Sequence, residues 1–324
     1  MNRRTFITVS AVGLFAAPLA AEAQAGKVYR IGFLGAASLS QYANQIDGMR
    51  LGLRDLGYVE GRNVVIEYRW AEGKYERLPD LAAELVRLKV DLIVTHGTPG
   101  AQAAKSATAT IPIVMAVVGN PVETGLVASI VRPGGNVTGI ALFFPELNAK
   151  RLELLKEAVP RIARVGALLN LDNPANASVL SAMGEAARAL RLELHRVGVR
   201  RPEELDGVIA QLKGRIDGLS VIDDAMLLAN AGRIAAIAAR NRLPAIGFRE
   251  YVEAGGLMAY GVNFPHIWRR SMSLVDKILR GAGPGDLPIE QATQFELIIN
   301  AKTAKALGLT IPPSVLIRAD QVIE

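Results

Sequence analysis

The segment from Val90 to Gly139 constrains the fold most strongly, because it contains the same pattern twice in succession. Two short apolar runs, Asp91 to Thr95 and Ile111 to Val117, each end in small or turn-forming residues that precede a helix-like stretch. An unbroken apolar run followed by a glycine-rich turn and a helix is typical of parallel sheets, whose strands are buried on both faces. The segment therefore predicts an α/β fold with parallel strands.

The same alternation of strands and helices extends on both sides of this segment. In the first half we expect strands at residues 29–35, 63–68, 91–95, 111–117 and 137–142. In the second half we expect them near residues 164–171, 192–197, 218–222, 244–248 and 257–261. Two runs of about five strands in 324 residues suit two Rossmann-like lobes, each large enough to bury its own core.

The last part of the chain suggests how the two lobes are joined. A helix is expected at residues 266–280 and a strand at residues 295–299. If that helix packs on the first half and that strand joins the second, the chain crosses between the lobes three times and forms a three-segment hinge facing a cleft. The expected N-terminal lobe is residues 25–141 plus about 262–288. The expected C-terminal lobe is residues 142–261 plus about 289–324.

The N-terminus has the pattern of an export signal. Arg3 and Arg4 precede an apolar run from Phe6 to Leu19, and Ala21-Glu22-Ala23 offers a small-residue cleavage site. We therefore expect residues 1–24 to be a signal peptide and the protein to be periplasmic, exported by the Sec route or, given the arginine pair, by the twin-arginine route. A buried N-terminal helix is the alternative. The chain has no cysteine, which excludes disulfides and a lipoprotein anchor.

Composition and motifs exclude several classes of function. The net charge is +6, but the basic residues are scattered, whereas nucleic-acid binding needs a concentrated basic face. The chain lacks a dinucleotide fingerprint, a phosphate-binding loop and a nucleophile elbow. The three histidines, His96, His195 and His266, are far apart, and no spacing suggests a metal site. We therefore expect no cofactor, no metal and no enzymatic activity.

Ligands of open α/β sheets bind beyond the carboxyl ends of the strands, which makes the loops there the candidate site. The candidates in the first half are Ser38, His96, Gly97, Thr98, Asn120 and Pro121. Gly97 and Thr98 open a helix, whose free N–H groups suit an anion, although Thr98 could simply cap that helix. Asn120 could instead bond its own turn, Ser38 could cap its own helix, and His96 could be a packed loop residue.

The second half offers a facing set of polar groups. The candidates are Asn170, Asn176, Ser178 and Asp223, with Asn173 and Asp224 beside them. Of the two adjacent aspartates we favour Asp223 as a partner for an amine on the ligand, and helix capping is the alternative role. Trp70 and Trp268 could stack on an aromatic ligand, but we expect both to pack between elements of the fold.

Six stretches of the chain resemble one family of exported substrate-binding proteins of ABC transporters, the cluster that includes tryptophan- and tyrosine-binding members. They are residues 51–73 (LGLRDLGYVEGRNVVIEYRWAEG), 97–105 (GTPGAQAAK), 125–139 (GLVASIVRPGGNVTG), 150–160 (KRLELLKEAVP), 251–261 (YVEAGGLMAYG) and 295–312 (FELIINAKTAKALGLTIP). One departure is that many members carry Asp where this chain has Asn120.

The resemblance implies two lobes of the periplasmic binding protein type I fold that close by a hinge on a small ligand. It implies an aromatic or branched amino acid, or a related carboxylate, as the ligand, and an ABC permease as the membrane partner. We expect a monomer that binds no nucleic acid. The alternatives are a sensor subunit that signals to a membrane receptor, or an exported α/β enzyme.

Overall fold

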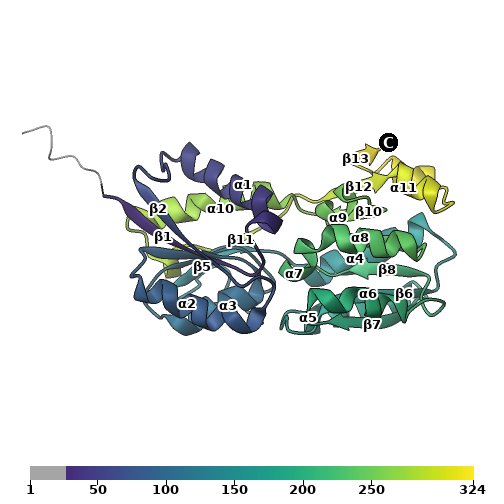
Figure 1. Cartoon of the computed structure of the whole chain (residues 1–324), viewed down its shortest axis with the longest axis horizontal. Helices are drawn as coiled ribbons and strands as arrows, with labels where there is room; N and C mark the ends of the chain where they lie inside the picture. The colour runs from purple at the N-terminus through teal and green to yellow at the C-terminus, as the bar shows by residue number, and fades with distance from the viewer. Residues whose placement is uncertain (1–26) are drawn as a thin grey trace, which may run out of the picture.

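The computed structural model describes residues 27–324, and it contains two sheets placed side by side along the long axis of the molecule (Figure 1). Each sheet carries helices on both faces and forms one lobe. The predicted α/β fold with two parallel-sheet lobes is therefore confirmed. The predicted signal peptide lies outside the described residues. Among residues 27–324, no helix combines the length and the apolar character that a membrane span requires.

The sheet of the first lobe is entirely parallel and has the strand order β11-β5-β4-β3-β1-β2. Its strands are β1 (Tyr29–Gly35), β2 (Val64–Trp70), β3 (Leu92–Thr95), β4 (Ile113–Val118), β5 (Val137–Ala141) and β11 (Glu290–Gln291). Every residue of β3 and β4 is buried, as expected for central strands covered on both faces.

Two pairs of helices cover this sheet. They are α1 (Ala43–Asp55) and α10 (Phe264–Leu279) on one face, and α2 (Leu78–Arg87) and α3 (Gly97–Ala107) on the other (Figure 1). Side chains of β1 alternate between the two faces. Phe33 belongs to the core under α1 and α10, and Leu34 belongs to the core under α2 and α3.

Helix α10 comes from late in the chain and packs tightly against α1. A Cβ atom at Gly48 of α1 would lie 2.4 Å from the backbone oxygen of Pro265, and one at Gly52 would lie 2.4 Å from that of Arg269. Two glycines on one face of α1 therefore let the backbones of the two helices approach closely. This contact fixes the late segment to the first lobe.

The sheet of the second lobe has the order β13-β12-β10-β9-β8-β6-β7 and is parallel except for the antiparallel pair β10 and β12. Its strands are β6 (Arg164–Asn170), β7 (Glu193–Val199), β8 (Gly218–Val221), β9 (Ala245–Gly247), β10 (Met258–Gly261), β12 (Glu296–Asn300) and β13 (Gln321–Ile323). The antiparallel strand β12 is the late segment that returns to this lobe.

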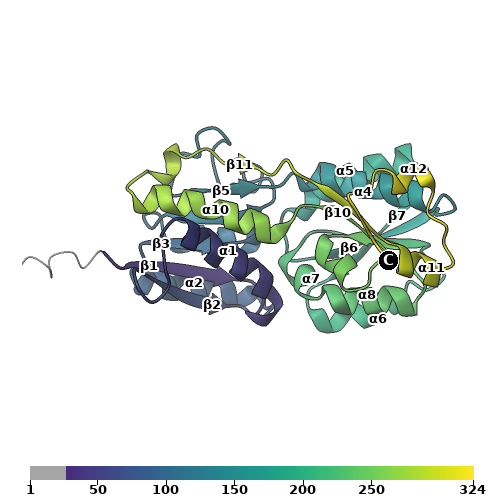
Figure 2. The same cartoon turned by 90° about the horizontal axis from the view of Figure 1, so that it is seen from above.

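Figure 2 shows helices on both faces of the second sheet. One face carries α4 (Phe144–Ala158), α5 (Asn176–Ala189) and α12 (Pro313–Leu316). The other face carries α6 (Leu205–Ala210), α7 (Ala225–Ala229) and α8 (Ala231–Arg240). Two further short helices are α9 (Arg249–Glu253) and α11 (Ala301–Ala306).

The chain passes between the two sheets three times: after β5, after β10 and after β11. The third passage lies a few residues beyond the position near residue 288 that the sequence suggested. Glu290 and Gln291 pair with Ile140 and Ala141 at the edge of the first sheet, so the chain leaves that lobe only after residue 291. This short strand satisfies backbone groups of β5 that would otherwise be unpaired.

Candidate functional site

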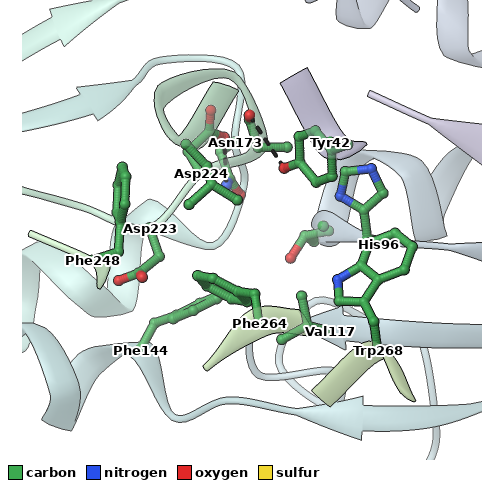
Figure 3. A pocket seen from close by; sticks show the side chains of 14 residues that line it. Tyr42, His96, Val117, Phe144, Asn173, Asp223, Asp224, Phe248, Phe264 and Trp268 are labelled. Atoms are coloured by element: carbon green, nitrogen blue, oxygen red, sulfur yellow. Dashed lines mark hydrogen bonds between the residues drawn. The ribbon is translucent and has the colours of Figure 1, made fainter. Parts of the chain in front are cut away.

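A cavity lies between the two lobes, beyond the carboxyl ends of both sheets (Figure 3). It contains about 460 Å³ of free space, part of which is open to solvent. The lining residues are Tyr42, His96, Gly97, Thr98, Val117, Phe144, Asn173, Asp223, Asp224, Ala225, Leu228, Phe248, Phe264 and Trp268.

The first lobe contributes the turn between β3 and α3. Gly97 has φ of +70°, a left-handed conformation that suits glycine, and it lets the chain turn directly into the helix. Thr98 follows in the first turn of α3 and is 1% exposed. Its Oγ1 has no hydrogen-bond partner among residues 27–324. A buried hydroxyl without a partner at a helix start is available to a ligand that brings an acceptor.

His96 is a neutral donor in this wall. Its Nε2 accepts a hydrogen bond from the backbone N–H of Ala36 at 3.3 Å, which places the remaining proton on Nδ1. Burial lowers the pKa of His96 to about 3, so the ring stays uncharged at neutral pH. The imidazole packs against Tyr42 and Trp268, with ring centroids 4.5 and 5.1 Å away.

The second lobe contributes a carboxylate that is held by a buried arginine. Asp223 follows β8, and its Oδ2 and Oδ1 accept from Nη1 and Nη2 of Arg151 at 2.6 and 3.1 Å. Arg151 is fully buried in α4 and also donates to the backbone oxygens of Val221 and Tyr260, at 3.0 and 2.7 Å. These bonds keep the Asp223 carboxylate in one orientation at the cavity wall.

Asp224 has a different role, because it caps the short helix α7. It accepts from the backbone N–H of Met226 at 2.9 Å and from the side-chain amides of Asn170 and Asn173 at 3.2 and 3.0 Å. The hydroxyl of Tyr75 donates to it from the first lobe at 3.0 Å. All these donors are neutral, and burial raises the pKa of Asp224 even though the hydrogen bonds act in the opposite direction.

Five aromatic side chains complete the cavity: Tyr42, Phe144, Phe248, Phe264 and Trp268 (Figure 3). Trp268 packs between elements as the sequence suggested, with its ring 5.7 Å from that of Phe33, and it lines the cavity as well. The sequence did not identify the three phenylalanines. Each follows a strand directly or nearly so, after β5, β9 and β10, so the rule for strand ends could have found them.

Two of these phenylalanines stand at the passages between the lobes. Phe144 and Phe264 are the first residues of α4 and α10, and each is followed by a proline in the first turn of its helix. Proline is well tolerated there because its position lacks an intrahelical N–H partner in any case. The first two crossings therefore each deliver a phenylalanine into the cavity.

The structure brings together only part of the site that the sequence suggested. His96, Gly97, Thr98 and Asp223 line the cavity. Asn170 lies behind the wall as a donor to Asp224, and Asn176 in turn donates to the backbone oxygen of Asn170.

The other candidates satisfy their own turns. Ser38 is bonded to Ser40 and Gln41, and Ser178 donates to the backbone oxygen of Ala175. Asn120 donates to Glu123, and Pro121 is not in the lining either. Short polar side chains readily bond nearby backbone and side-chain groups in this way. A loop position at a strand end was therefore not enough to predict that these residues line the cavity.

Hydrogen bonds join the lobes around the cavity. Gln41 and Tyr42, in the 3₁₀ turn η1 (Ser40–Tyr42), donate to the backbone oxygens of Ala229 and Ala225 at 3.2 and 3.3 Å. Gln45 donates to Glu250 at 3.0 Å, and Tyr75, in η2 (Tyr75–Arg77), donates to Asp224. The lobes are thus in direct contact on two sides of the site.

Comparisons with known proteins agree with this architecture. A tyrosine-binding protein from Clostridioides difficile is 32% identical over 81% of this chain and 76% of its own length. A structure titled as an ABC domain in complex with L-Trp, from Streptococcus pneumoniae, is 27% identical, with a TM-score of 0.84 over 91% of this chain and 99% of that one. The ligand-free, open structure of a substrate-binding protein with adhesive properties from Clostridium difficile is 29% identical, with a TM-score of 0.64 over 91% and 99%.

The fold is that of type I periplasmic binding proteins. The family described as ABC transporter substrate binding protein matches residues 36–323, which is nearly the whole described chain. The chain belongs to this family of ABC transporter substrate-binding proteins.

Proposed function

We propose that this protein is the extracytoplasmic solute-binding component of an ABC importer and that it binds an amino acid with an aromatic or branched side chain between its lobes. The observation that carries the proposal is the cavity itself, where an unpartnered donor on one lobe faces a fixed carboxylate on the other. An α-amino acid carries one group for each of these walls.

The ligand's carboxylate would lie at the start of α3. The free N–H groups of the first turn and the unpartnered Oγ1 of Thr98 both suit an anion, and the helix dipole adds to this preference. Nδ1–H of His96 is a further neutral donor on the same side. The wall thus offers donors but no positively charged side chain among its lining residues.

The ligand's ammonium group would lie against Asp223. Asp224 already receives bonds from two amides, a phenol and a backbone N–H, so it has little capacity left. Asp223 is held by one arginine and keeps lone pairs for a second cation. The apolar body of the ligand would fill the space between the five aromatic side chains, which are large, rigid contact surfaces.

We also propose that ligand binding closes the hinge and that the structure described here has the closed arrangement. The two structures named above are 27% and 29% identical to this chain, yet the TM-score is 0.84 for the complex with L-Trp and 0.64 for the ligand-free, open form. Nearly equal sequence identity with unequal structural similarity points to a difference in how the lobes are arranged. Ligand favours closure because only the closed cavity satisfies both polar walls at once.

Export, oligomeric state and delivery to the membrane are further parts of the proposal. We propose that residues 1–24 direct export, that the protein acts outside the cytoplasm as a monomer, and that it delivers its ligand to an ABC permease without catalysis. We propose that the boundaries between the lobes lie at the three crossings, after β5, β10 and β11. Size-exclusion chromatography with light scattering tests the monomer, and N-terminal sequencing of the exported protein tests cleavage after residue 24.

A thermal-shift screen tests the ligand class. Ligands that bind only the folded protein raise its melting temperature by mass action. We expect a clear rise with L-tyrosine, L-tryptophan or a branched amino acid, and a smaller one with the corresponding acids that lack the amine. Shifts with aromatic acids alone would reject the amino-acid part of the proposal.

The variant Asp223→Asn makes this test sharper. It removes the proposed partner of the amine and retains a side chain of the same shape. We expect its affinity for the amino acid to fall more than its affinity for the matching acid without the amine. An equal fall for both compounds would show that Asp223 does not contact the amine.

A further inference from the structure

Glu250 is a titratable group at the contact between the lobes that the proposed ligand site does not use. It lies in α9 of the second lobe and is partly buried. Its Oε1 accepts from Nε2 of Gln45, in α1 of the first lobe, at 3.0 Å. Its Oε2 is sealed from solvent and has no hydrogen-bond partner among residues 27–324.

The surroundings of Glu250 offer little compensation for a negative charge. On its own helix, Arg249 directs Nη1 and Nη2 to Glu253 and Glu296, and Glu253 is a further anion. From the first lobe, Gln45 and Tyr42 are neutral neighbours.

Asp223 adds another negative charge from the end of β8. The neighbouring stretch of α8 contributes only Ala231 and Gly232 to the small cavity beside Glu250. Arg249, the cation on the same helix, is thus shared between two other carboxylates, and Arg151 is paired with Asp223. The side-chain donor that reaches Glu250 is the amide of Gln45.

We propose that the closed form binds one proton at Glu250 that the open form releases, so that ligand binding is accompanied by proton uptake. This inference rests on the proposed hinge closure. Closure brings Gln45 and Tyr42 of the first lobe over a carboxylate that the separated lobes would leave in contact with water. When Glu250 is ionised, its sealed Oε2 is an acceptor with no donor beside it. Protonation removes the negative charge and turns the carboxyl group into a hydrogen-bond donor.

The direction of the effect follows from the charge. In the closed form burial raises the pKa of Glu250 to about 7, with Glu253 and Asp223 adding to the rise. An exposed glutamate has a pKa of about 4.3. The closed form therefore holds more protons than the open form between about pH 4.3 and pH 7. Ligand affinity should rise as the pH falls through this range, by at most about tenfold per pH unit, and should become constant above it.

Few other groups of the site confound this measurement. His96 is held neutral over the whole range, because burial places its pKa at about 3. The carboxyl and ammonium groups of an amino-acid ligand do not titrate near neutral pH. Asp224 also lies in the cavity with a raised pKa, so the unaltered protein must be compared with a variant at position 250 alone.

The test is calorimetric titration of the full exported protein with L-tyrosine, L-tryptophan and L-leucine at several pH values between 5 and 8. Each pH is repeated in two buffers with different ionisation enthalpies, because the difference in heat counts the protons taken up. We expect uptake of nearly one proton near pH 6 and tighter binding at pH 5 than at pH 8.

Glu250→Gln is the decisive variant, and Glu253→Gln, an exposed residue of the same helix, is the matched control. The amide at position 250 can still accept from Gln45, so we expect Glu250→Gln to bind at pH 8 as tightly as the unaltered protein binds at pH 5. Its pH dependence should be lost, whereas Glu253→Gln should retain it, displaced to lower pH because Glu253 adds to the raised pKa of Glu250. A merely structural role of Glu250 would weaken binding equally at every pH.

The outcomes separate the two proposals. Binding of a probe without proton uptake, or with the same pH dependence in Glu250→Gln, would overturn this inference and leave the proposed function standing. Failure of all three amino acids to bind would overturn the proposed ligand class and this inference with it. If Glu250→Gln is unstable, the buffer comparison is repeated with Asp224→Asn. Proton uptake that persists in this variant supports Glu250, and uptake that disappears overturns the inference.

Discussion

The hydroxyl of Tyr75 on the first lobe donates to the carboxylate of Asp224 on the second, with 3.0 Å between the two oxygen atoms. The same hydroxyl accepts from the backbone N–H of Met226 at 3.1 Å, so it bridges the cap and the first turn of α7. The bond joins the lobes at the wall of the cavity. It can therefore exist only while the lobes are together.

Replacing Tyr75 with phenylalanine should weaken ligand binding without unfolding either lobe. The variant loses both hydrogen bonds that this hydroxyl makes across the lobes. One such bond is worth about 0.5–1.5 kcal/mol, so the affinity should fall by at least roughly twofold to tenfold. Calorimetric titration measures the change. Tyr58→Phe is the matched control, because Tyr58 bonds Asp276 at 2.9 Å within the first lobe. An equal loss of affinity in both variants would argue against a role for Tyr75 in closure.

Thr98→Val should lower ligand affinity and leave stability nearly unchanged. The Thr98 hydroxyl has no partner within residues 27–324, so the fold loses no bond when a methyl group replaces it. A bond to a ligand carboxylate is worth about 1.5–3 kcal/mol, which is roughly a tenfold to hundredfold change. Thr95→Val is the control, since Thr95 donates to the backbone oxygen of Leu34 and its loss should affect urea unfolding and not binding. Unchanged affinity in Thr98→Val would remove Thr98 from the site.

Arg151→Met should strongly destabilise the second lobe. The change leaves Asp223 buried without its cation, and breaking a buried pair in this way costs about 3–5 kcal/mol. Urea unfolding followed by circular dichroism measures the loss. Arg164→Met is the control, because the Arg164–Asp217 pair is partly exposed and such pairs contribute about 1 kcal/mol or less. Similar losses for the two variants would mean that the buried pair stabilises the fold no more than a surface pair.

His96 should make the protein less stable in acid. Its pKa is about 3 in the folded protein and about 6.5 when unfolded, so between these values the unfolded chain binds a proton that the folded chain does not. Stability from this residue is complete above about pH 6.5 and falls as the pH decreases, by at most about 1.4 kcal/mol per pH unit. Urea unfolding of His96→Gln from pH 7 to 4 should show a shallower loss. The exposed His266→Gln should behave as the unaltered protein does, and identical slopes in all three would contradict the prediction.

Gly48→Ala should separate α1 from α10. The added Cβ would meet the backbone oxygen of Pro265 at 2.4 Å, and overpacking of this kind costs about 1–3 kcal/mol. Gly184→Ala in α5 is the control, because its Cβ would meet only the end of the Arg188 side chain at 3.9 Å. Replacing that open helical glycine should stabilise the protein by up to about 1 kcal/mol. Thermal unfolding distinguishes the two, and a Gly48→Ala variant as stable as its parent would contradict the close packing.

The parallel-sheet core could be predicted because burial on both faces leaves a direct mark on the sequence. The runs that become β3 and β4 are nearly continuous apolar segments, and every residue of the two strands is buried. The helix that returns to the first lobe and the strand that returns to the second were also recognisable. The start of α4 is marked in the sequence only by Pro145, which fits the first turn of a helix beginning at Phe144.

The cavity was only partly predictable. His96, Gly97 and Thr98 could be placed because a strand end followed by Gly leaves few other positions for them. Asn120 has the same sequence context, but its amide bonds Glu123, a choice between neighbours that only the folded turn decides. Phe248 and Phe264 follow strand ends, but their residue type alone resembles that of core residues, because a side chain that faces the cavity is as apolar as one that faces the core.

Phe144 and Phe264 each follow a crossing between the lobes and each reach the cavity. Under the proposed function, the residues that shape the apolar part of the site are thus covalently next to the segments that must bend. An exchange at either position would alter the choice of ligand and the opening motion together. A lineage that acquires a new ligand through these two positions would therefore also inherit a new release rate, and the two properties could not be selected independently there.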